Sequence, residues 1–301
     1  MGGGNREFRI TRSGQLIHIE TLADERTPGN LSEFWKERGT DQPILLQIHG
    51  GDFSRFYEKA GVIRRLLIRR LLRKCALIVV PSDSWKNAFS TIVRDERIRV
   101  LPEGADAISD ARFEELKPLR RQRMQILFDG VIGEDSGSYD LPQIIVHTAQ
   151  CVPDVRFVLA GNGDIDGVRA MIPEPYVSRN VLFSGDPEQE GRTWLLERSC
   201  IYLQPSYHGD VPGAVLEAMG YGLAVVATGV GEIGEIVRDN YNGYLPEPGD
   251  VGGITSRLTE LLNDPETLFL AGENSLSIVR SRYSREQYES GLQKYMRSLA
   301  T

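Results

Sequence analysis

Residues 205–219 read PSYHGDVPGAVLEAM, and this stretch decides the fold. A polar loop that contains proline and glycine passes here directly into an apolar helix. The loop follows Ile201–Leu203, a short apolar run typical of a buried strand. Strands that lead through such loops into helices are the repeating unit of an open parallel sheet. The stretch therefore predicts an α/β domain that binds a ligand where its strands end.

Two other loops have the same placement after apolar, strand-like runs, namely Gly130–Gly133 and Thr228–Ile233. Because the carboxyl ends of parallel strands lie at one edge of a sheet, we expect the three loops to form one crevice. The helix that begins after Pro212 points free N–H groups at this crevice, which suits a phosphate. Glu217 lies about one turn into that helix, within reach of the ribose of a nucleotide whose phosphates occupy the helix N-terminus.

Strand-like and helix-like segments alternate along the chain, which predicts an α/β protein with two Rossmann-like, doubly wound domains. The polar, charged run at about 106–123 is the expected linker, so we predict domains at 1–119 and 120–301. The amphipathic segment Arg285–Ala300 is the expected last helix of the second domain. The expected strands lie at 15–20, 44–48, 76–80 and 98–101, and then at 126–128, 155–160, 181–183, 201–203 and 224–227.

Composition and charge narrow the class of protein. The chain is 41% hydrophobic and 26% charged, as in a globular protein, and its net charge of −7 disfavours binding to nucleic acid. Its apolar runs are too short to span a bilayer and its start does not resemble a signal peptide, so we expect a cytoplasmic protein. Because Cys75, Cys151 and Cys200 lack metal-ligand spacing, we expect reduced thiols.

The stretch from Pro205 to Asp250 resembles the C-terminal domain of GT-B glycosyltransferases of family 4, and the resemblance extends over roughly residues 14–300. It implies two Rossmann-like domains that face each other across a cleft. It also implies a hexosyltransferase that moves a sugar from a nucleotide-diphosphate donor to an acceptor hydroxyl, with retention and without a metal or other cofactor. The residues that carry the resemblance are Leu216–Met219, Val225–Thr228, Asn242-Gly243, Pro248–Asp250, Ala160–Gly163 and Ile48–Phe53.

The resemblance assigns roles to individual residues. His49 would lie beside the donor sugar and Glu217 would hold the donor ribose, and Asp210 is the second expected catalytic residue. The donor would be a UDP- or GDP-sugar, and the acceptor a sugar or a lipid-linked sugar, as in polysaccharide or glycolipid assembly. The expected donor-binding residues are Gly130, Val131, Ser136, His208, Gly209, Val211, Pro212, Gly213, Ala214, Val215 and Glu217.

The sequence departs from the family pattern at the donor site. Val131 and Ser136 occupy the positions of the Arg and Lys that clamp the diphosphate, and Gly209 replaces a sugar-contacting Glu for which Asp210 is the nearest substitute. Loss of one oxyanion-stabilising donor costs about 10²–10³ in rate. A catalytically silent binding or partner subunit is therefore an alternative, and a sugar-nucleotide epimerase of the same fold is a third.

The first domain departs from the pattern as well. No segment matches the opening strands or the glycine-rich loop of the family, and Gly2-Gly3-Gly4 follows no strand, so we expect an incomplete domain.

Two weaker patterns each allow two interpretations. Six cations accompany an apolar stripe in Ile63–Lys74. Such a helix can either lie peripherally on the inner membrane surface through Arg64–Lys74 or cover a sheet with an arginine-rich solvent face. Asp164-Ile165-Asp166 imitates a metal-binding DxD motif, but it falls where the family has a variable loop, and we predict no metal site.

Overall fold

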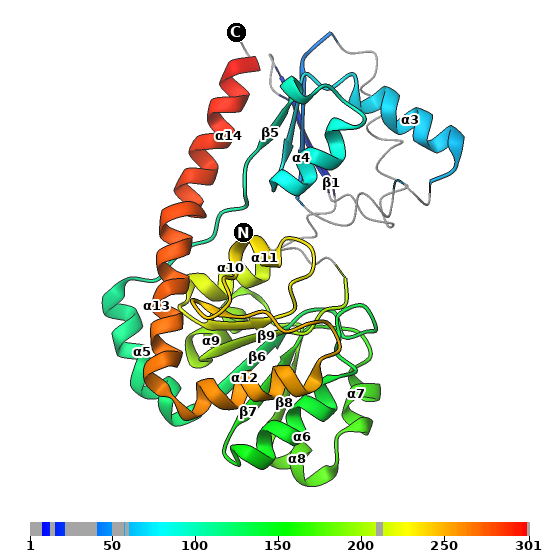
Figure 1. Cartoon of the computed structure of the whole chain (residues 1–301). Helices are drawn as coiled ribbons and strands as arrows, with labels where there is room; N and C mark the ends of the chain where they lie inside the picture. The colour runs from blue at the N-terminus through cyan, green and yellow to red at the C-terminus, as the bar shows by residue number, and fades with distance from the viewer. Residues whose placement is uncertain are drawn as a thin grey trace. The chain divides into compact units, whose positions relative to one another are not determined.

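The computed structural model describes residues 8–12, 16–21, 41–49, 57, 60–208 and 213–299. The chain divides into two compact units, each with its own largely parallel sheet (Figure 1). Unit 1 consists of Met1–Gly104 together with Arg285–Thr301, and unit 2 is Ala105–Ser284. The predicted fold class, α/β with two Rossmann-like domains, is confirmed.

Unit 2 is built on a six-stranded parallel sheet with the strand order β11-β10-β9-β6-β7-β8. The chain runs outward from β6 to β8 and then returns to place β9 on the other side of β6, so the strand order reverses between these two strands. Ligands of open sheets bind beyond the carboxyl ends of the strands at such a reversal. The strands are β6 Gln125–Asp129, β7 Arg156–Ala160, β8 Val181–Gly185, β9 Ile201–Gln204, β10 Ala224–Ala227 and β11 Gly243–Tyr244.

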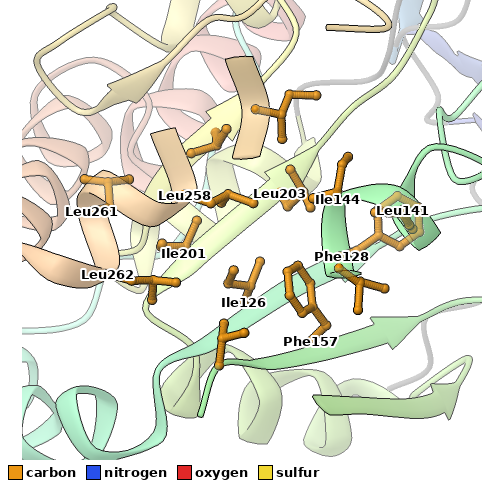
Figure 2. Close-up of a cluster of buried hydrophobic side chains, with 14 of the residues drawn as sticks. Ile126, Phe128, Leu141, Ile144, Phe157, Ile201, Leu203, Leu258, Leu261 and Leu262 are labelled. Atoms are coloured by element: carbon orange, nitrogen blue, oxygen red, sulfur yellow. The ribbon is translucent and has the colours of Figure 1, made fainter. Parts of the chain in front are cut away.

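Side chains of this sheet alternate between two hydrophobic cores, as the period of a strand requires. Figure 2 shows Ile126 and Phe128 of β6 in the core that α6 and α12 close with Leu141 and Leu258. Leu127 points to the opposite core, which α9, α10 and α13 cover. The helices are α6 Leu141–Cys151, α7 Ile165–Met171, α8 Glu174–Asn180, α9 Gln189–Arg198, α10 Gly213–Gly220, α11 Ile233–Ile236, α12 Val251–Asn263 and α13 Pro265–Arg282.

The predicted linker at 106–123 is wrong, because most of it forms α5 (Asp110–Arg123), a helix of unit 2. Phe113 and Leu116 of α5 are buried, and so is the whole side chain of Arg120. Burial lowers the pKa of Arg120 to about 10. Because α5 belongs to unit 2, the boundary between the two units falls at Gly104 and not at residue 119. Arg120 donates hydrogen bonds to the carbonyls of Leu196, Glu197, Tyr221 and Gly222, which close α9 and α10.

Unit 1 has a five-stranded sheet in the order β1-β2-β3-β4-β5, parallel except for β1. On one face α3 (Val62–Leu72) and α4 (Asp83–Ser90) cover it, and the Ser82 side chain caps α4. Residues 2–4 and 22–40 lie outside the described residues. The strands are β1 Phe8–Arg12, β2 Ile17–Thr21, β3 Ile44–Ile48, β4 Leu77–Val80 and β5 Ile98–Val100.

The other face of the unit 1 sheet is covered by α14 (Arg285–Leu299), which corrects the assignment of this helix to the second domain. Leu292, Tyr295, Met296 and Leu299 pack there on Leu16, Leu45, Leu77 and Val79. The helix was recognised from its amphipathic pattern, but the pattern does not specify which sheet the helix covers.

A chain of polar groups accompanies this packing. Gln47 of β3 is buried, and its side-chain amide donates a hydrogen bond to the Tyr288 hydroxyl of α14. The amide oxygen of Gln47 lies 2.9 Å from Nε2 of His18, with which it shares a hydrogen bond. The apolar contacts and this polar chain together attach α14 to unit 1.

Candidate functional site at the strand ends of unit 2

The loops that follow β6 and β7 extend the parallel ladder beyond the strands. The Ile132 N–H donates to the Asn162 carbonyl at 2.7 Å, and the Asp164 N–H donates to the Ile132 carbonyl at 3.0 Å. Gly161 has a φ of +119°, and a Cβ there would lie 1.9 Å from the Gly130 carbonyl oxygen. Only glycine allows this approach, so Gly130 is held by the backbone of the neighbouring loop.

The loop after β6 also packs on the loop after β9. The Tyr207 N–H donates to the Asp135 carbonyl at 2.9 Å. Gly137 has a φ of +68°, and a Cβ there would lie 1.8 Å from the Pro205 carbonyl oxygen. The Tyr207 hydroxyl donates to Asp140 at 2.7 Å, and this bond raises the pKa of Tyr207. The structure thus brings together two of the loops that the sequence analysis placed in one crevice.

The loop after β10 joins the same edge. The Thr228 side chain is fully buried, and its hydroxyl donates to the Ser206 carbonyl at 2.5 Å. The Thr228 N–H donates to the Gln204 carbonyl at 3.0 Å. Of the predicted site residues in this region, Gly209, Asp210, Val211 and Pro212 lie outside the described residues.

Val131 and Ser136, two of the expected donor-binding residues, lie in the loop after β6 and carry no charge. Val131 is 54% exposed, and the Ser136 hydroxyl donates to the Gly133 carbonyl at 2.8 Å. Next to Ser136, the exposed Asp135 carboxylate lies 3.7 Å from Nε2 of His208. The described part of this loop therefore carries an apolar side chain, a hydroxyl and acidic groups where the resembled family has a cationic clamp.

The start of α10 has one half-buried face made by Gly213, Ala214 and Glu217. Val215 is fully buried in the core beneath the helix. Val215 can therefore offer a ligand only its backbone, as the sequence analysis expected for this stretch. Gly213 and Ala214 have no side chain beyond Cβ, and Glu217 lies one turn further on the same face.

A cation that sequence reasoning missed lies beside Glu217. Arg192, in the first turn of α9, places its Nε 3.1 Å from a carboxylate oxygen of Asp129, the last residue of β6. Its Nη1 lies 3.9 Å from the carboxylate of Glu217. Burial raises the pKa of Asp129, and the charge of Arg192 opposes that shift. No sequence spacing relates Arg192 to Glu217, because the sheet alone brings α9 and α10 together.

His49 lies in unit 1 at the carboxyl end of β3. It is buried, and its Nδ1 lies 3.3 Å from the carboxylate of Glu103, which follows β5. The sequence pattern points to His49, but no sequence signal connects this residue with Glu103. Residues 50–53 of the same loop lie outside the described residues.

Asp164, the first acid of the DxD-like sequence, has a structural role. Its carboxylate caps α7 by accepting the Gly167 N–H at 3.1 Å, and it also accepts the Tyr139 hydroxyl at 2.8 Å. Among the described residues, no group of three or more His, Cys, Asp or Glu side chains could hold a metal ion. Within the same residues, no helix is long and apolar enough to cross a membrane.

Two Rossmann-like units, one with glycine-lined loops at its strand ends, match the GT-B fold of solved glycosyltransferase structures. HepE from Anabaena in complex with UDP matches with a TM-score of 0.73 and 19% identity, over 93% of this chain and 78% of that chain. A TarM mutant from S. aureus, in complex with Fondaparinux, alpha-GlcNAc-glycerol and UDP, matches with a TM-score of 0.71 and 18% identity, over 93% and 55%.

Residues 125–264 match the family model described as glycosyl transferases group 1. Phosphatidyl-myo-inositol mannosyltransferase of Mycobacterium tuberculosis is 26% identical over 208 residues, which are 68% of this chain and 50% of the relative. N-acetyl-alpha-D-glucosaminyl L-malate synthase of Bacillus anthracis is 30% identical over 142 residues, 46% of this chain and 37% of the relative. This chain thus spans about half the length of the curated relatives, or less. Residues 125–264, which lie within unit 2, are thus similar to the group 1 glycosyltransferases.

Proposed function

We propose that the chain takes part in transfer of a sugar from a nucleotide-diphosphate donor to an acceptor hydroxyl, with retention and without a metal. The observation that carries the proposal is the half-buried face of α10, where Glu217 follows the small residues Gly213 and Ala214 by one turn. N–H groups at the helix start would bind the diphosphate, and Glu217 would accept hydrogen bonds from the ribose hydroxyls. UDP in the HepE and TarM complexes and the mannosyltransferase named above support a donor of this class.

Calorimetry with a panel of UDP- and GDP-sugars tests the donor site. Glu217→Gln keeps the shape of the side chain but removes its charge. Because hydrogen bonds to charged groups contribute about 1.5–3 kcal/mol, we expect this variant to weaken donor binding about 10- to 100-fold. Glu266→Gln, at an exposed position of α13, is the matched control and should bind like the unmodified chain. Absence of binding by the unmodified chain, or equal binding by Glu217→Gln, would contradict the proposal.

A binding or partner subunit without turnover is the second candidate, and the loop after β6 favours it. Val131 and Ser136 supply no charge to a leaving diphosphate, and Asp135 lies nearby. The double variant Val131→Arg/Ser136→Lys restores the two cations and should raise donor affinity if the site is weakened by their absence. Turnover by the unmodified chain, measured as release of nucleoside diphosphate in the presence of an acceptor, would exclude this candidate.

The exposed surface of helix α3 supports the proposal that the acceptor is lipid-linked and that the chain contacts a membrane surface peripherally. Only Ile68, Leu71 and Leu72 of α3 are buried against the sheet. Four further apolar residues face solvent, and basic residues follow on the same exposed side, so the helix carries more apolar surface than the sheet needs. The exposed apolar residues are Val62 (75%), Ile63 (77%), Leu66 (60%) and Leu67 (42%), and the exposed cations are Arg69, Arg70, Arg73 and Lys74.

Co-sedimentation with vesicles tests this surface. The chain should bind vesicles that contain anionic phospholipid and should lose most of that binding in Leu66→Ser/Leu67→Ser, because both the apolar insertion and the adjacent cations contribute. Leu270→Ser, at an exposed apolar position of α13, is the control. Equal binding to purely zwitterionic vesicles would argue against the electrostatic part, and no effect of the double variant would argue against α3.

A further inference from the structure

Arg192 is held between two carboxylates that come from different elements of unit 2. Its Nε and Nη2 approach the two carboxylate oxygens of Asp129 at 3.1 and 3.5 Å. Its Nη1 is left on the side of Glu217, 3.9 Å from a carboxylate oxygen. A guanidinium group is planar and rigid, so anchoring one edge on Asp129 fixes the direction in which the remaining N–H groups point.

The pair of Arg192 with Asp129 is more buried than the pair of Arg192 with Glu217. The Asp129 side chain is 9% exposed, whereas Arg192 and Glu217 are 32% and 30% exposed. Asp129 also lies at the last position of β6, where its backbone carbonyl accepts the Tyr202 hydroxyl at 2.9 Å. Asp129 is thus a fixed anchor within the sheet, and the outer pair of Arg192 and Glu217 lies at the surface of the strand-end site. A surface pair of this kind contributes little to folding.

We infer that Arg192 is a positioning residue, which orients the Glu217 carboxylate toward the hydroxyls of the donor ribose. The inference rests on the proposed function. A glutamate side chain has several rotamers, and it binds two neighbouring hydroxyls well only when its carboxylate is already directed at them. Arg192 supplies that direction from a neighbouring helix, with its Nη1 3.9 Å from the carboxylate.

Calorimetry on the full chain with UDP and GDP, and with their 2′,3′-dideoxy counterparts, tests the inference. Arg192→Ala should weaken binding of whichever ribonucleotide the unmodified chain binds by roughly tenfold, and leave binding of the dideoxy nucleotide unchanged. Arg192→Lys should recover part of the loss, because lysine keeps the charge but lacks the planar fork. Combined with Glu217→Gln, the Arg192→Ala change should have no further effect. Arg198→Ala, on the same helix, is the matched control and should leave both affinities unchanged.

The outcomes separate the inference from the proposed function. If Arg192→Ala weakens ribonucleotide and dideoxynucleotide equally, Arg192 acts on another part of the ligand or on the fold, and the inference is overturned. Additive losses in the double variant would overturn it too, because two groups that act through one contact are not additive. If the unmodified chain binds neither UDP nor GDP, the donor proposal itself fails, which is a different result from either of these.

Discussion

The two units cover their parallel sheets in different ways. Unit 2 is one continuous segment, Ala105–Ser284, and the helices that cover its sheet all lie within that segment. Unit 1 instead receives α14, which begins at Arg285 although β5 ends at Val100 (Figure 1). The strand-end loops of unit 2 are fixed backbone against backbone, as at Gly161 and Gly130. The cover of unit 1 is fixed by side chains.

The two units differ in how far their stability depends on distant parts of the chain. Unit 2 holds all the parts of its own cores, so it should tolerate loss of the chain end. Unit 1 has half of its cover at a large separation in sequence, so its stability depends on a contact that local signals do not specify.

Truncation after Ser284 should unfold unit 1 and leave unit 2 folded. Without α14, four buried aliphatic side chains of unit 1 meet water, each worth about 1.5–3 kcal/mol. Their sum is comparable with the whole stability of a small domain, about 5–15 kcal/mol. Hydrogen exchange should then lose protection in β2–β5 and retain it in β6–β10. The exposed side chains would be Leu16, Leu45, Leu77 and Val79.

Protection that persists in β3 and β4 of the truncated chain would show that α14 is dispensable for unit 1. Loss of protection in β6 would show instead that unit 2 also needs α14. In either case the contrast between the two units would not hold.

Much of the fold was predictable because strands leave a strong local signal. The strand expected at 44–48 is β3 Ile44–Ile48, and the strand expected at 224–227 is β10 Ala224–Ala227. Continuous apolar runs between turn residues identify such buried strands without any knowledge of their neighbours. The loop at Pro205 was recognised for the same reason, because proline and glycine next to an apolar helix form a local pattern.

The features that the sequence did not predict depend on long-range contacts or on the burial of a charged side chain. The charge of segment 106–123 is typical of a linker, yet Arg120 is buried and donates hydrogen bonds to four carbonyls. The choice of the sheet that α14 covers and the approach of Arg192 to Glu217 both depend on how the elements are arranged in the fold. No local sequence pattern specifies that arrangement. Local periodicity identifies the individual helices and strands. The site depends on which of these helices and strands lie next to each other in the fold.

Gly161→Ala should destabilise unit 2 and disturb the donor site together. The residue has a φ of +119°, and the new Cβ would meet the Gly130 carbonyl oxygen at 1.9 Å, so the backbones of two loops must separate. Backbone strain and overpacking together should cost on the order of 3 kcal/mol. Gly133→Ala, in the same region but with no atom within 4 Å of the new Cβ and no positive φ, is the control. Equal unfolding midpoints in denaturant for the two variants would contradict the conclusion that close backbone contact between the two loops holds the site.

Tyr288→Phe should have the smallest effect, confined to unit 1. It removes the hydroxyl that accepts the Gln47 amide, and because Gln47 is buried its N–H would lose that partner. An unsatisfied buried donor costs about 1–3 kcal/mol, and a partly exposed tyrosine lets water relieve some of this, so we expect about 1 kcal/mol. Tyr295→Phe on the same helix removes a hydroxyl whose bond to the Val100 carbonyl is long, 3.5 Å, and should cost less. Native-state hydrogen exchange of the β3 amides measures both variants. If Tyr288→Phe costs no more than Tyr295→Phe, the polar chain from His18 through Gln47 adds nothing to the attachment of α14.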